Sequence, residues 1–257
     1  MAGAAIAAVA LLLLGQVILA RGRTYLVNVD FTVDRTVGPD LGSTNPFELR
    51  VLGDSTAAGV GTDAIADALP VMIAERVAQR IGRPVHVVGH GVSGARTADV
   101  RREQLARLDD DVDAIVIAVG SNDVLHLTPT PRLQDQTRDL LRAARATGAP
   151  VVLGGIPRFA GVTALGRPLR DVTDRFAGIQ REAQRRAAAP VDGAVFVDIA
   201  ALASPRFAGR PEAFSSDDFH PSAVGYGFWA DALAPAVVTL AGERQRAGGT
   251  SPVTGSR

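Results

Sequence analysis

The sequence contains no cysteine, and all 27 of its basic residues are arginine. Without cysteine the fold has no disulfide, no thiolate zinc site and no cysteine nucleophile, and the cellular compartment cannot be inferred from redox chemistry. A global excess of charge is also missing, because 27 acidic residues balance the arginines to a formal net charge of +0. The arginines are scattered and form no basic patch, so we expect no nucleic-acid partner.

What is present is the composition of a globular protein. Hydrophobic residues make up 47% of the 257 residues and charged residues 21%. A chain of this length can bury one substantial core, and single α/β domains of this size are ordinary. No internal repeat is visible, and nothing in the sequence decides between a monomer and a dimer.

The N-terminal segment, residues 1–23, differs from the rest of the chain. Its long apolar run is interrupted only by Gly15 and Gln16, and Arg21 and Arg23 follow at once. About 20 apolar residues are needed to span a bilayer, so the run is only just long enough. Three interpretations compete: a membrane anchor, a cleaved signal peptide and a buried helix. A buried helix is the least favoured, because an uncharged N-terminal run followed by arginine is typical of membrane segments.

An uncleaved anchor is favoured over a signal peptide. A signal peptide usually carries positive charge before its apolar core, and Ile18-Leu19-Ala20 is a poor cleavage site. We therefore predict a protein anchored to the membrane by a single N-terminal segment, or secreted if the segment is cleaved. The positive-inside rule would place the domain in the cytoplasm, whereas arginines hidden upstream of a misassigned start would reverse this, so the side of the membrane stays open.

Two further segments have no sustained hydrophobic period. Residues 24–46 are punctuated by glycine and proline and are predicted to form a linker. Residues 242–257 are rich in Gly, Ser, Thr and Arg and are predicted to be a disordered tail. The residues between them, 47–241, form the predicted domain.

Short apolar runs alternate with longer amphipathic stretches along this domain. The runs, which predict buried strands, are Phe47–Leu52, Val85–Val88, Ala114–Val119, Val151–Leu153 and Ala194–Val197. The amphipathic stretches, which predict helices, are Ile65–Ile81, Thr97–Leu108, Leu133–Thr147, Val172–Ala188 and Ala223–Ala241. This alternation indicates a single three-layer α/β/α domain with a mostly parallel, flavodoxin-like sheet of five strands. Functional sites in such sheets lie beyond the carboxyl ends of the strands.

The first strand runs into Gly53-Asp54-Ser55-Thr56. A serine flanked by small residues just past a buried strand can present its hydroxyl at a loop–helix junction, where a backbone N–H can also point at an anion. The same residues are good helix N-caps, so this motif alone decides nothing.

The second strand runs into a segment with glycine at positions 89, 91 and 94, followed by Thr97. Glycines here allow the backbone to approach a ligand closely. Glycine-rich turns between strands and helices are common, however, and neither a dinucleotide fingerprint nor a Walker phosphate loop is present.

The third strand ends in Gly120-Ser121-Asn122-Asp123. The Asn122 amide is a suitable donor for a developing oxyanion, and Asp123 could brace the loop. An ordinary turn favours the same residues and is the preferred explanation when the motif is taken alone.

The last candidate, Asp217-Asp218-Phe219-His220, precedes the final helix. Asp217 and His220 are three residues apart, so within one turn the carboxylate can reach the imidazole and orient it as a base. Asp217 or Asp218 could instead cap a turn, with His220 exposed. The remaining histidines show no spacing typical of a metal site.

The order Ser, Gly, Asn, His, each at a strand end or before the last helix, resembles the SGNH hydrolase family, also called GDSL-like esterases and lipases. Gly53-Asp54-Ser55, Ser93-Gly94, Gly120-Ser121-Asn122-Asp123 and Asp217-Asp218-Phe219-His220 match its four blocks, and the resemblance runs from about Leu49 to about Trp229. Thr56 replaces the leucine that gives the motif its name, and Gly89 stands where asparagine is frequent. The position of Thr56 carries no catalytic atom.

The resemblance implies acyl transfer through a covalent intermediate. Ser55 is the expected nucleophile, His220 its base and Asp217 the residue that orients the base. The expected oxyanion hole consists of the backbone N–H groups of Ser55 and Gly94 and the Asn122 amide, with Gly91 as an alternative to Gly94. No metal or organic cofactor is required.

The substrate is predicted only as a class. The family takes short-chain esters, acetylated sugars, thioesters and lysophospholipids, and an N-terminal anchor favours lipid or cell-envelope esters slightly. After the fourth strand, Phe159, Leu165 and Leu169 could line an acyl site. Arg158, Arg167 or Arg170 could meet a phosphate or carboxylate, or lie in solvent.

Two other classes of function compete with a hydrolase. A non-catalytic module on the same fold could bind a carbohydrate or ester, although the intact Ser55, Asp217 and His220 argue against a decayed enzyme. A flavodoxin-like nucleotide or flavin protein would share the parallel sheet and use the loop at Gly53-Asp54-Ser55-Thr56 for phosphate. That interpretation leaves the Asp217–His220 pair unexplained.

Overall fold

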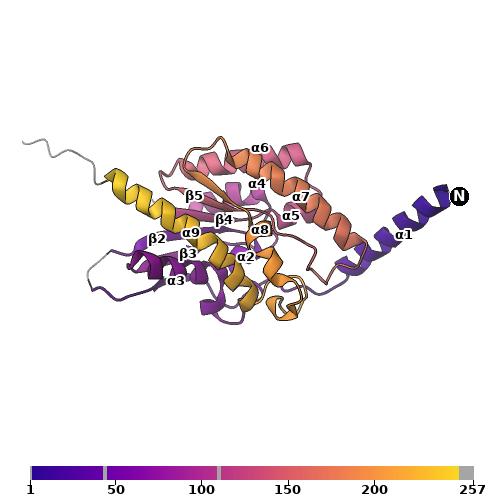
Figure 1. Ribbon diagram of the computed structural model, residues 1–257, viewed down its shortest axis with the longest axis horizontal. Coiled ribbons are helices and arrows are strands. Elements are labelled where there is room, and N and C mark those ends of the chain that lie inside the picture. Colours follow the sequence, from indigo (N-terminus) through magenta and orange to yellow (C-terminus); the bar gives the residue numbers. More distant parts are fainter. Residues whose placement is uncertain (1, 43–44, 109–110, 249–257) are drawn as a thin grey trace, which may run out of the picture.

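The computed structural model describes residues 2–42, 45–108 and 111–248, which form one layered α/β domain with a helix projecting from it (Figure 1). At its centre is a sheet in the order β1-β3-β2-β4-β5-β6. Strands β2 to β6 are parallel to their neighbours, and β1 pairs with β3 in the antiparallel direction. The strands are β1 (Asp34–Val37), β2 (Phe47–Gly53), β3 (Val85–Gly89), β4 (Ala114–Ala118), β5 (Val151–Gly154) and β6 (Ala194–Val197).

The predicted α/β class and the five parallel strands are confirmed, each strand beginning at the expected residue and ending within one residue of it. The sheet nevertheless has six strands rather than five, because β1 lies inside the predicted linker 24–46. Its residues Asp34–Val37 pair with Val88–Val85 of β3 at the edge of the sheet. Most of its side chains are exposed, so this edge strand lacks the apolar run by which the others are recognised.

The helices cover both faces of the sheet. They are α1 (Ala2–Arg21), α2 (Ser55–Ala58), α3 (Leu69–Ile81), α4 (Thr97–Asp99), α5 (Ser121–Leu125), α6 (Thr130–Arg145), α7 (Leu169–Ala188), α8 (Ile199–Leu202) and α9 (Ala223–Gly248). Single 3₁₀ turns lie at Ile65–Asp67, Leu105–Arg107, Ser204–Phe207 and Pro211–Ala213.

Three helix predictions need correction. The predicted helix Ile65–Ile81 begins with a separate 3₁₀ turn at Ile65–Asp67, and α3 starts only at Leu69. Thr97–Leu108 is no continuous α-helix, because α4 passes into a π-helical turn at Val100–Gln104 and then into a 3₁₀ turn. The last helix extends to Gly248 and so includes the first seven residues of the predicted tail 242–257. The remainder of that predicted tail lies outside the described residues.

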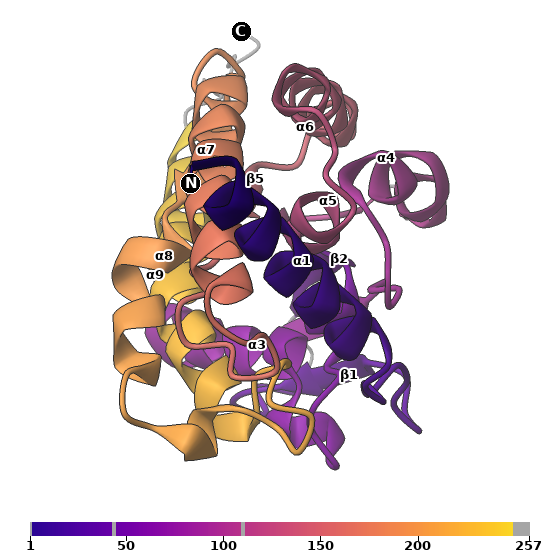
Figure 2. The ribbon, with the colours of Figure 1, turned by 90° about the vertical axis from the view of Figure 1, so that its right-hand side faces the viewer.

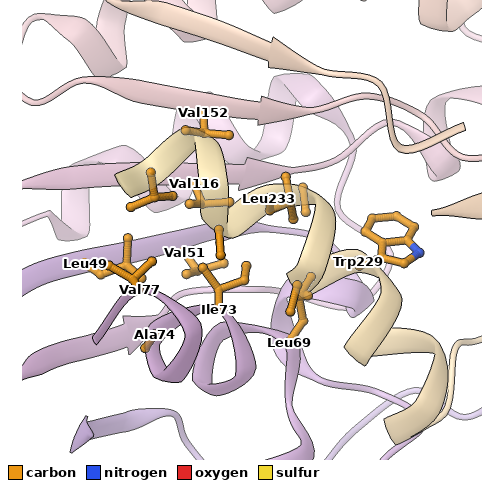
Figure 3. Close-up of a cluster of buried hydrophobic side chains, with 14 of the residues drawn as sticks. Leu49, Val51, Leu69, Ile73, Ala74, Val77, Val116, Val152, Trp229 and Leu233 are labelled. Atoms are coloured by element: carbon orange, nitrogen blue, oxygen red, sulfur yellow. The ribbon is translucent and has the colours of Figure 1, made fainter. Parts of the chain in front are cut away.

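One face of the sheet packs against α3 and α9 (Figure 3). Alternate strand residues supply its inner layer, since successive side chains of a strand point to opposite faces. The labelled side chains of this cluster are Leu49, Val51, Val116 and Val152 from the strands, Leu69, Ile73, Ala74 and Val77 from α3, and Trp229 and Leu233 from α9. This packing fixes α9, and with it the loop that precedes α9.

The opposite face of the sheet is covered by α6 and α7. Ile115 and Ile117, the residues of β4 that alternate with Val116, pack there with Leu153 of β5 against Leu140 and Leu141 of α6. Strands β3, β2 and β4 are parallel neighbours in the sheet. Their carboxyl ends therefore lie side by side at one end of the sheet, between the two helical layers.

The N-terminal helix α1 projects from this end of the domain and crosses it from α7 towards β1 (Figures 1 and 2). Its described side chains include exposed Leu11, Leu12, Leu14, Ile18 and Leu19. Among the described residues, the one helix long and apolar enough to cross a membrane is Ala223–Glu243 of α9, half of which is buried in the core, while Ala7–Arg21 is a shorter apolar helix. The membrane anchor proposed for residues 1–23 stays a prediction.

His86 of β3 connects the edge strand to the sheet. Its Nδ1 lies 2.8 Å from Glu48 Oε2 on β2, and its Nε2 lies 2.9 Å from Asp34 Oδ1 on β1. Burial alone would lower the pKa of His86, but the hydrogen bonds to the two carboxylates outweigh it and raise the pKa above its ordinary value. A raised pKa in the folded state means that protonation of His86 stabilises the fold.

We therefore predict that His86→Asn costs most stability below about pH 6.5, the ordinary pKa of histidine, and that the cost shrinks as the pH rises through the folded-state pKa. Urea unfolding of both proteins at a series of pH values measures this. Thr36→Ala, which removes the uncharged side chain paired with His86 in the β1–β3 register, is the control and should show no such trend. A loss that is the same at all pH values would contradict the prediction.

Candidate active site

The serine of the first block lies at the start of the short helix α2, directly after β2. Asp54 is the N-cap of α2, and its Oδ1 accepts a hydrogen bond of 2.9 Å from Thr56 N. The cap is therefore Asp54 and not Ser55, which leaves the Ser55 hydroxyl available for another partner. Burial raises the pKa of Asp54 to about 6, against the hydrogen bonds from Thr56.

That partner is His220, in the loop that precedes α9. Its Nε2 lies 3.0 Å from Ser55 Oγ, and its Nδ1 lies 2.6 Å from Asp217 Oδ2. Ser55, Asp217 and His220 are each less than a tenth exposed. The structure thus brings together three residues that are up to 165 positions apart in the chain, in the order hydroxyl, imidazole, carboxylate.

Asp217 is held as a carboxylate by a ring of donors. Its Oδ1 accepts hydrogen bonds from Ser215 Oγ, Phe219 N and His220 N at 2.8, 3.0 and 2.9 Å. Burial alone would raise the pKa of Asp217, but these donors and the His220 ring hold it well below its usual range. A carboxylate that stays charged beside the imidazole favours the imidazolium that forms when the base takes a proton.

The two remaining blocks lie in the same cavity. Ser55, Gly94, Asn122 and His220 all line it, whereas Gly91 does not. A Cβ at Gly91 would lie 2.2 Å from Ala58 N, so this glycine serves the close packing of its loop on the serine turn. A Cβ at Gly94 would meet nothing within 4 Å. Of the two glycines left open by the sequence, Gly94 is the one placed to face a ligand.

Asn122 is fixed in the first turn of α5. Its Nδ2 donates one hydrogen bond of 3.1 Å to Ala95 O, next to Gly94, and the amide nitrogen carries a second N–H. Asp123 braces the two loops, because Oδ2 accepts from Thr97 N and Oγ1 at 2.9 and 2.8 Å and Oδ1 accepts from Thr128 Oγ1 at 3.0 Å.

A model of the GDSL-like Lipase/Acylhydrolase family matches residues 51–228. The chain belongs to this family. The resemblance to SGNH hydrolases inferred from the four sequence blocks is thereby confirmed, and the site described above lies at the positions of those blocks.

Relatives and solved structures agree with this assignment. The chain is 32% identical over 193 residues to the GDSL-like esterase Rv1075c of Mycobacterium tuberculosis, an alignment that covers 73% of this chain and 61% of that protein. A candidate SGNH hydrolase from Slackia heliotrinireducens is 27% identical, with a TM-score of 0.54 over 74% of this chain and 98% of that one. Axe2, an acetylxylan esterase from Geobacillus stearothermophilus, is 18% identical with a TM-score of 0.51 over 74% and 94% of the two chains, which shows the fold alone.

The cavity has a volume of about 1310 Å³. Phe159, Leu165 and Leu169, the three apolar residues singled out after the fourth strand, line it. Of the three arginines from that region, Arg158 and Arg170 line the cavity and Arg167 does not. Arg158 is paired with Asp174 at 2.8 Å. Most of the lining is apolar, so the cavity suits an apolar group of a substrate.

Buried glutamines that the sequence motifs did not identify hold the strand ends in place. Gln104 accepts from Gly53 N and donates to Gly53 O, both at 2.8 Å. Gln184 of α7 accepts from Ile156 N at 3.0 Å and donates to Val119 O at 2.9 Å. A glutamine at a core-facing position of an amphipathic helix is the signal that could have revealed them, because buried amides need partners.

Residues of the N-terminal segment also reach the site. Leu13, Val17 and Ala20 of α1 and Tyr25 and Leu26 beyond it line the cavity. The sequence pattern predicts an anchor and a linker for these residues, because an apolar run carries no sign that one side of it faces a cavity.

The different surroundings of the two glycines lead to a prediction. Gly91→Ala should destabilise the protein by several kcal/mol, since its Cβ would meet the backbone of Ala58, and overpacking against a rigid neighbour typically costs about 1–3 kcal/mol or more. Gly94→Ala has free space and should cost only about 1 kcal/mol, the typical strain of a left-handed backbone at a residue other than glycine. Urea unfolding measures both, and equal losses would contradict this account of the loop.

Proposed function

We propose that the protein is a carboxylic ester hydrolase that forms an acyl-enzyme on Ser55. The observation that carries the proposal is the continuous hydrogen-bonded series from Ser55 Oγ to His220 at 3.0 Å and from His220 to Asp217 at 2.6 Å. Nucleophile and base within hydrogen-bond reach, with the base oriented by a third group, is the arrangement that activates a serine hydroxyl. Membership of the esterase family supports the same reaction.

In the first half-reaction, Ser55 Oγ attacks the ester carbonyl carbon while His220 Nε2 accepts the hydroxyl proton. The C–O bond to the alcohol then breaks, and His220 returns the proton to the leaving alcohol. In the second half-reaction, water attacks the acyl-enzyme with His220 again as base, which releases the acid and restores Ser55. Asp217 holds the tautomer with Nδ1–H and stabilises the imidazolium between the two transfers.

The tetrahedral oxyanion is assigned to three donors: the backbone N–H groups of Ser55 and Gly94 and the second N–H of the Asn122 amide. Support comes from their shared cavity and from the first N–H of that amide, which fixes its orientation by bonding to Ala95 O. Donors held in place before charge develops need no reorganisation in the transition state.

For the substrate we propose an ester with an apolar acyl chain, at a membrane to which α1 anchors the enzyme. The apolar cavity of about 1310 Å³ is far larger than an acetyl group requires, and α1 exposes leucine and isoleucine side chains beside it. An acetylated sugar is the second candidate, because the structural neighbour Axe2 is an acetylxylan esterase.

A fluorophosphonate probe tests the reaction. The full chain in detergent should be labelled on serine and should hydrolyse a p-nitrophenyl ester, and Ser55→Ala should lose both activities because no hydroxyl remains. The activity of His220→Ala should fall by orders of magnitude while the thermal unfolding midpoint is kept. The activity of Asp217→Ala should fall as well, and its midpoint should drop, because the variant removes the acceptor of five hydrogen bonds. A folded wild type that neither labels nor hydrolyses would reject catalysis and would make the protein an ester- or carbohydrate-binding module.

A series of p-nitrophenyl esters tests the acyl preference. Each buried CH₂ contributes about 0.8 kcal/mol, so kcat/KM should rise from acetate through butyrate to octanoate by about threefold or more per CH₂ until the cavity is filled. Acetylated xylooligosaccharides serve as the competing substrate. A maximum at acetate together with turnover of the acetylated sugar would favour the second candidate.

A further inference from the structure

One side of α1 is docked against the domain, although the helix is apolar all round. Leu13, Gln16, Val17 and Ala20 are partly buried, at the spacing i, i+3, i+4, i+7 that places residues on one side of a helix. The residues between them, such as Leu14 and Leu19, are 56% and 73% exposed. Three of the four docked residues line the candidate active site.

The fourth docked residue, Gln16, fixes α1 to the opposite wall of the cavity. Its Oε1 accepts a hydrogen bond of 2.9 Å from Leu169 N, and its Nε2 donates to Arg167 O. Leu169 is the first residue of α7, so Gln16 satisfies a backbone N–H at the N-terminus of that helix, where no earlier turn supplies an acceptor. The only amide side chain in an otherwise apolar run is thus used to seat α1 beside Leu169, a lining residue.

The segment that follows α1 contacts the catalytic loop directly. Leu26 N donates to Asp217 Oδ2 at 3.1 Å, the same oxygen that His220 Nδ1 engages at 2.6 Å. Arg23 Nη2 lies 3.0 Å from Asp218 Oδ2 and 3.5 Å from Asp217 O. The ring of Tyr25 packs edge-on against Phe219, with centroids 5.3 Å apart.

Asp218, the partner of Arg23, has an unfavourable backbone conformation. Its φ of +59° is left-handed, a conformation that residues other than glycine adopt at a cost. The turn that carries Asp217 and His220 therefore includes a residue in an unfavourable backbone conformation, and Arg23 pairs with its side chain and with the preceding carbonyl. Surface ion pairs stabilise little by themselves, so we assign the larger effect to the Leu26 N–H, which bonds to a buried carboxylate.

We propose that Leu13, Val17 and Ala20 of α1 form, with Tyr25 and Leu26, one wall of the active site, in which the docked side of α1 contacts the acyl chain of the substrate and Leu26 N–H is a positioning group for Asp217 and His220. This inference rests on the proposed function of Ser55, Asp217 and His220. It names the substrate more closely, because an acyl chain held against Leu13 and Val17 lies beside the exposed apolar side of the same helix. An ester leaving a lipid surface would reach Ser55 along α1.

The positioning role is tested by removing one N–H from the full chain in detergent. Leu26→Pro has no N–H to donate, and a hydrogen bond to a charged group contributes about 1.5–3 kcal/mol, so kcat for p-nitrophenyl butyrate should fall about tenfold or more. KM should change less than kcat, because the lost N–H bonds to Asp217 and not to the substrate. Leu26→Ala measures the loss of the side chain alone, and the effect assigned to the hydrogen bond is the difference between the two variants.

Asn28→Pro is the matched control for a proline in this segment. Asn28 is exposed, and among the described residues its N–H makes no hydrogen bond, so its kcat should equal that of the wild type. A Leu26→Pro variant with the kcat of Leu26→Ala would overturn the positioning role. So would a kcat loss matched by Asn28→Pro, which would indicate a general effect of chain stiffness.

The acyl-contact role is tested by placing the same bulky side chain on the docked side and on the exposed side of α1. Val17→Trp fills the cavity, and Leu19→Trp adds the same bulk to the exposed side. We expect Val17→Trp to raise KM for the octanoate ester about tenfold, the equivalent of losing burial of about two CH₂ groups, without raising KM for the acetate ester. Leu19→Trp should leave both values unchanged.

Equal effects of the two tryptophans, or none, would overturn the acyl-contact role. Failure of this inference is distinguishable from failure of the proposed function, which rests on Ser55. If Ser55→Ala abolishes fluorophosphonate labelling while Leu26→Pro and Val17→Trp behave like the wild type, catalysis by Ser55 is supported and the proposed role of the N-terminal segment is rejected. Thermal unfolding midpoints of all variants show that the domain remains folded.

Discussion

The carboxylate of Asp217 is buried, and the geometry of the site depends on its staying charged. A charge removed from water is tolerated only where hydrogen bonds replace the water. Here Oδ1 accepts three, from Ser215, Phe219 and His220 N–H, and Oδ2 accepts two, from the His220 ring and from Leu26. Four of these donors belong to the loop itself, so the loop must fold as one unit around the carboxylate. That unit fixes the imidazole at 3.0 Å from Ser55 Oγ.

The serine side of this hydrogen bond is set by the middle of the sheet. Because β2 lies between β3 and β4, its end must pass close to both neighbouring strand ends, and Gly53 is the consequence: a Cβ there would lie 1.9 Å from Ala118 O. The Gln104 side chain hydrogen-bonds to both the backbone N–H and the C=O of Gly53, and Asp54 caps α2. These local requirements are met by different side chains, so the Ser55 hydroxyl is left with His220 as its partner.

Most of this arrangement could be predicted from the sequence. The parts that could not be predicted share one cause. Buried strands carry an apolar run, and Ser55, Asn122 and His220 follow such runs or precede the last helix, so their meeting at one sheet edge was predictable from topology. Strand β1 was not, since its side chains are mostly exposed. The Leu26 contact is made by a backbone N–H, 191 positions from its acceptor, and every residue but proline has one. A pattern of side chains cannot indicate an interaction to which the side chain contributes nothing.

Gln16 shows how an apolar segment can still have a defined orientation. The apolar side chains of α1 differ little around the helix, so hydrophobicity alone gives no reason for one side to face the domain. An amide that faces lipid without partners costs several kcal/mol, whereas facing α7 it bonds to Leu169 N and Arg167 O. The same rotation turns Leu13, Val17 and Ala20 into the cavity and leaves Leu14 and Leu19 outside. One polar residue therefore decides which side of the helix packs against the domain and which side stays exposed.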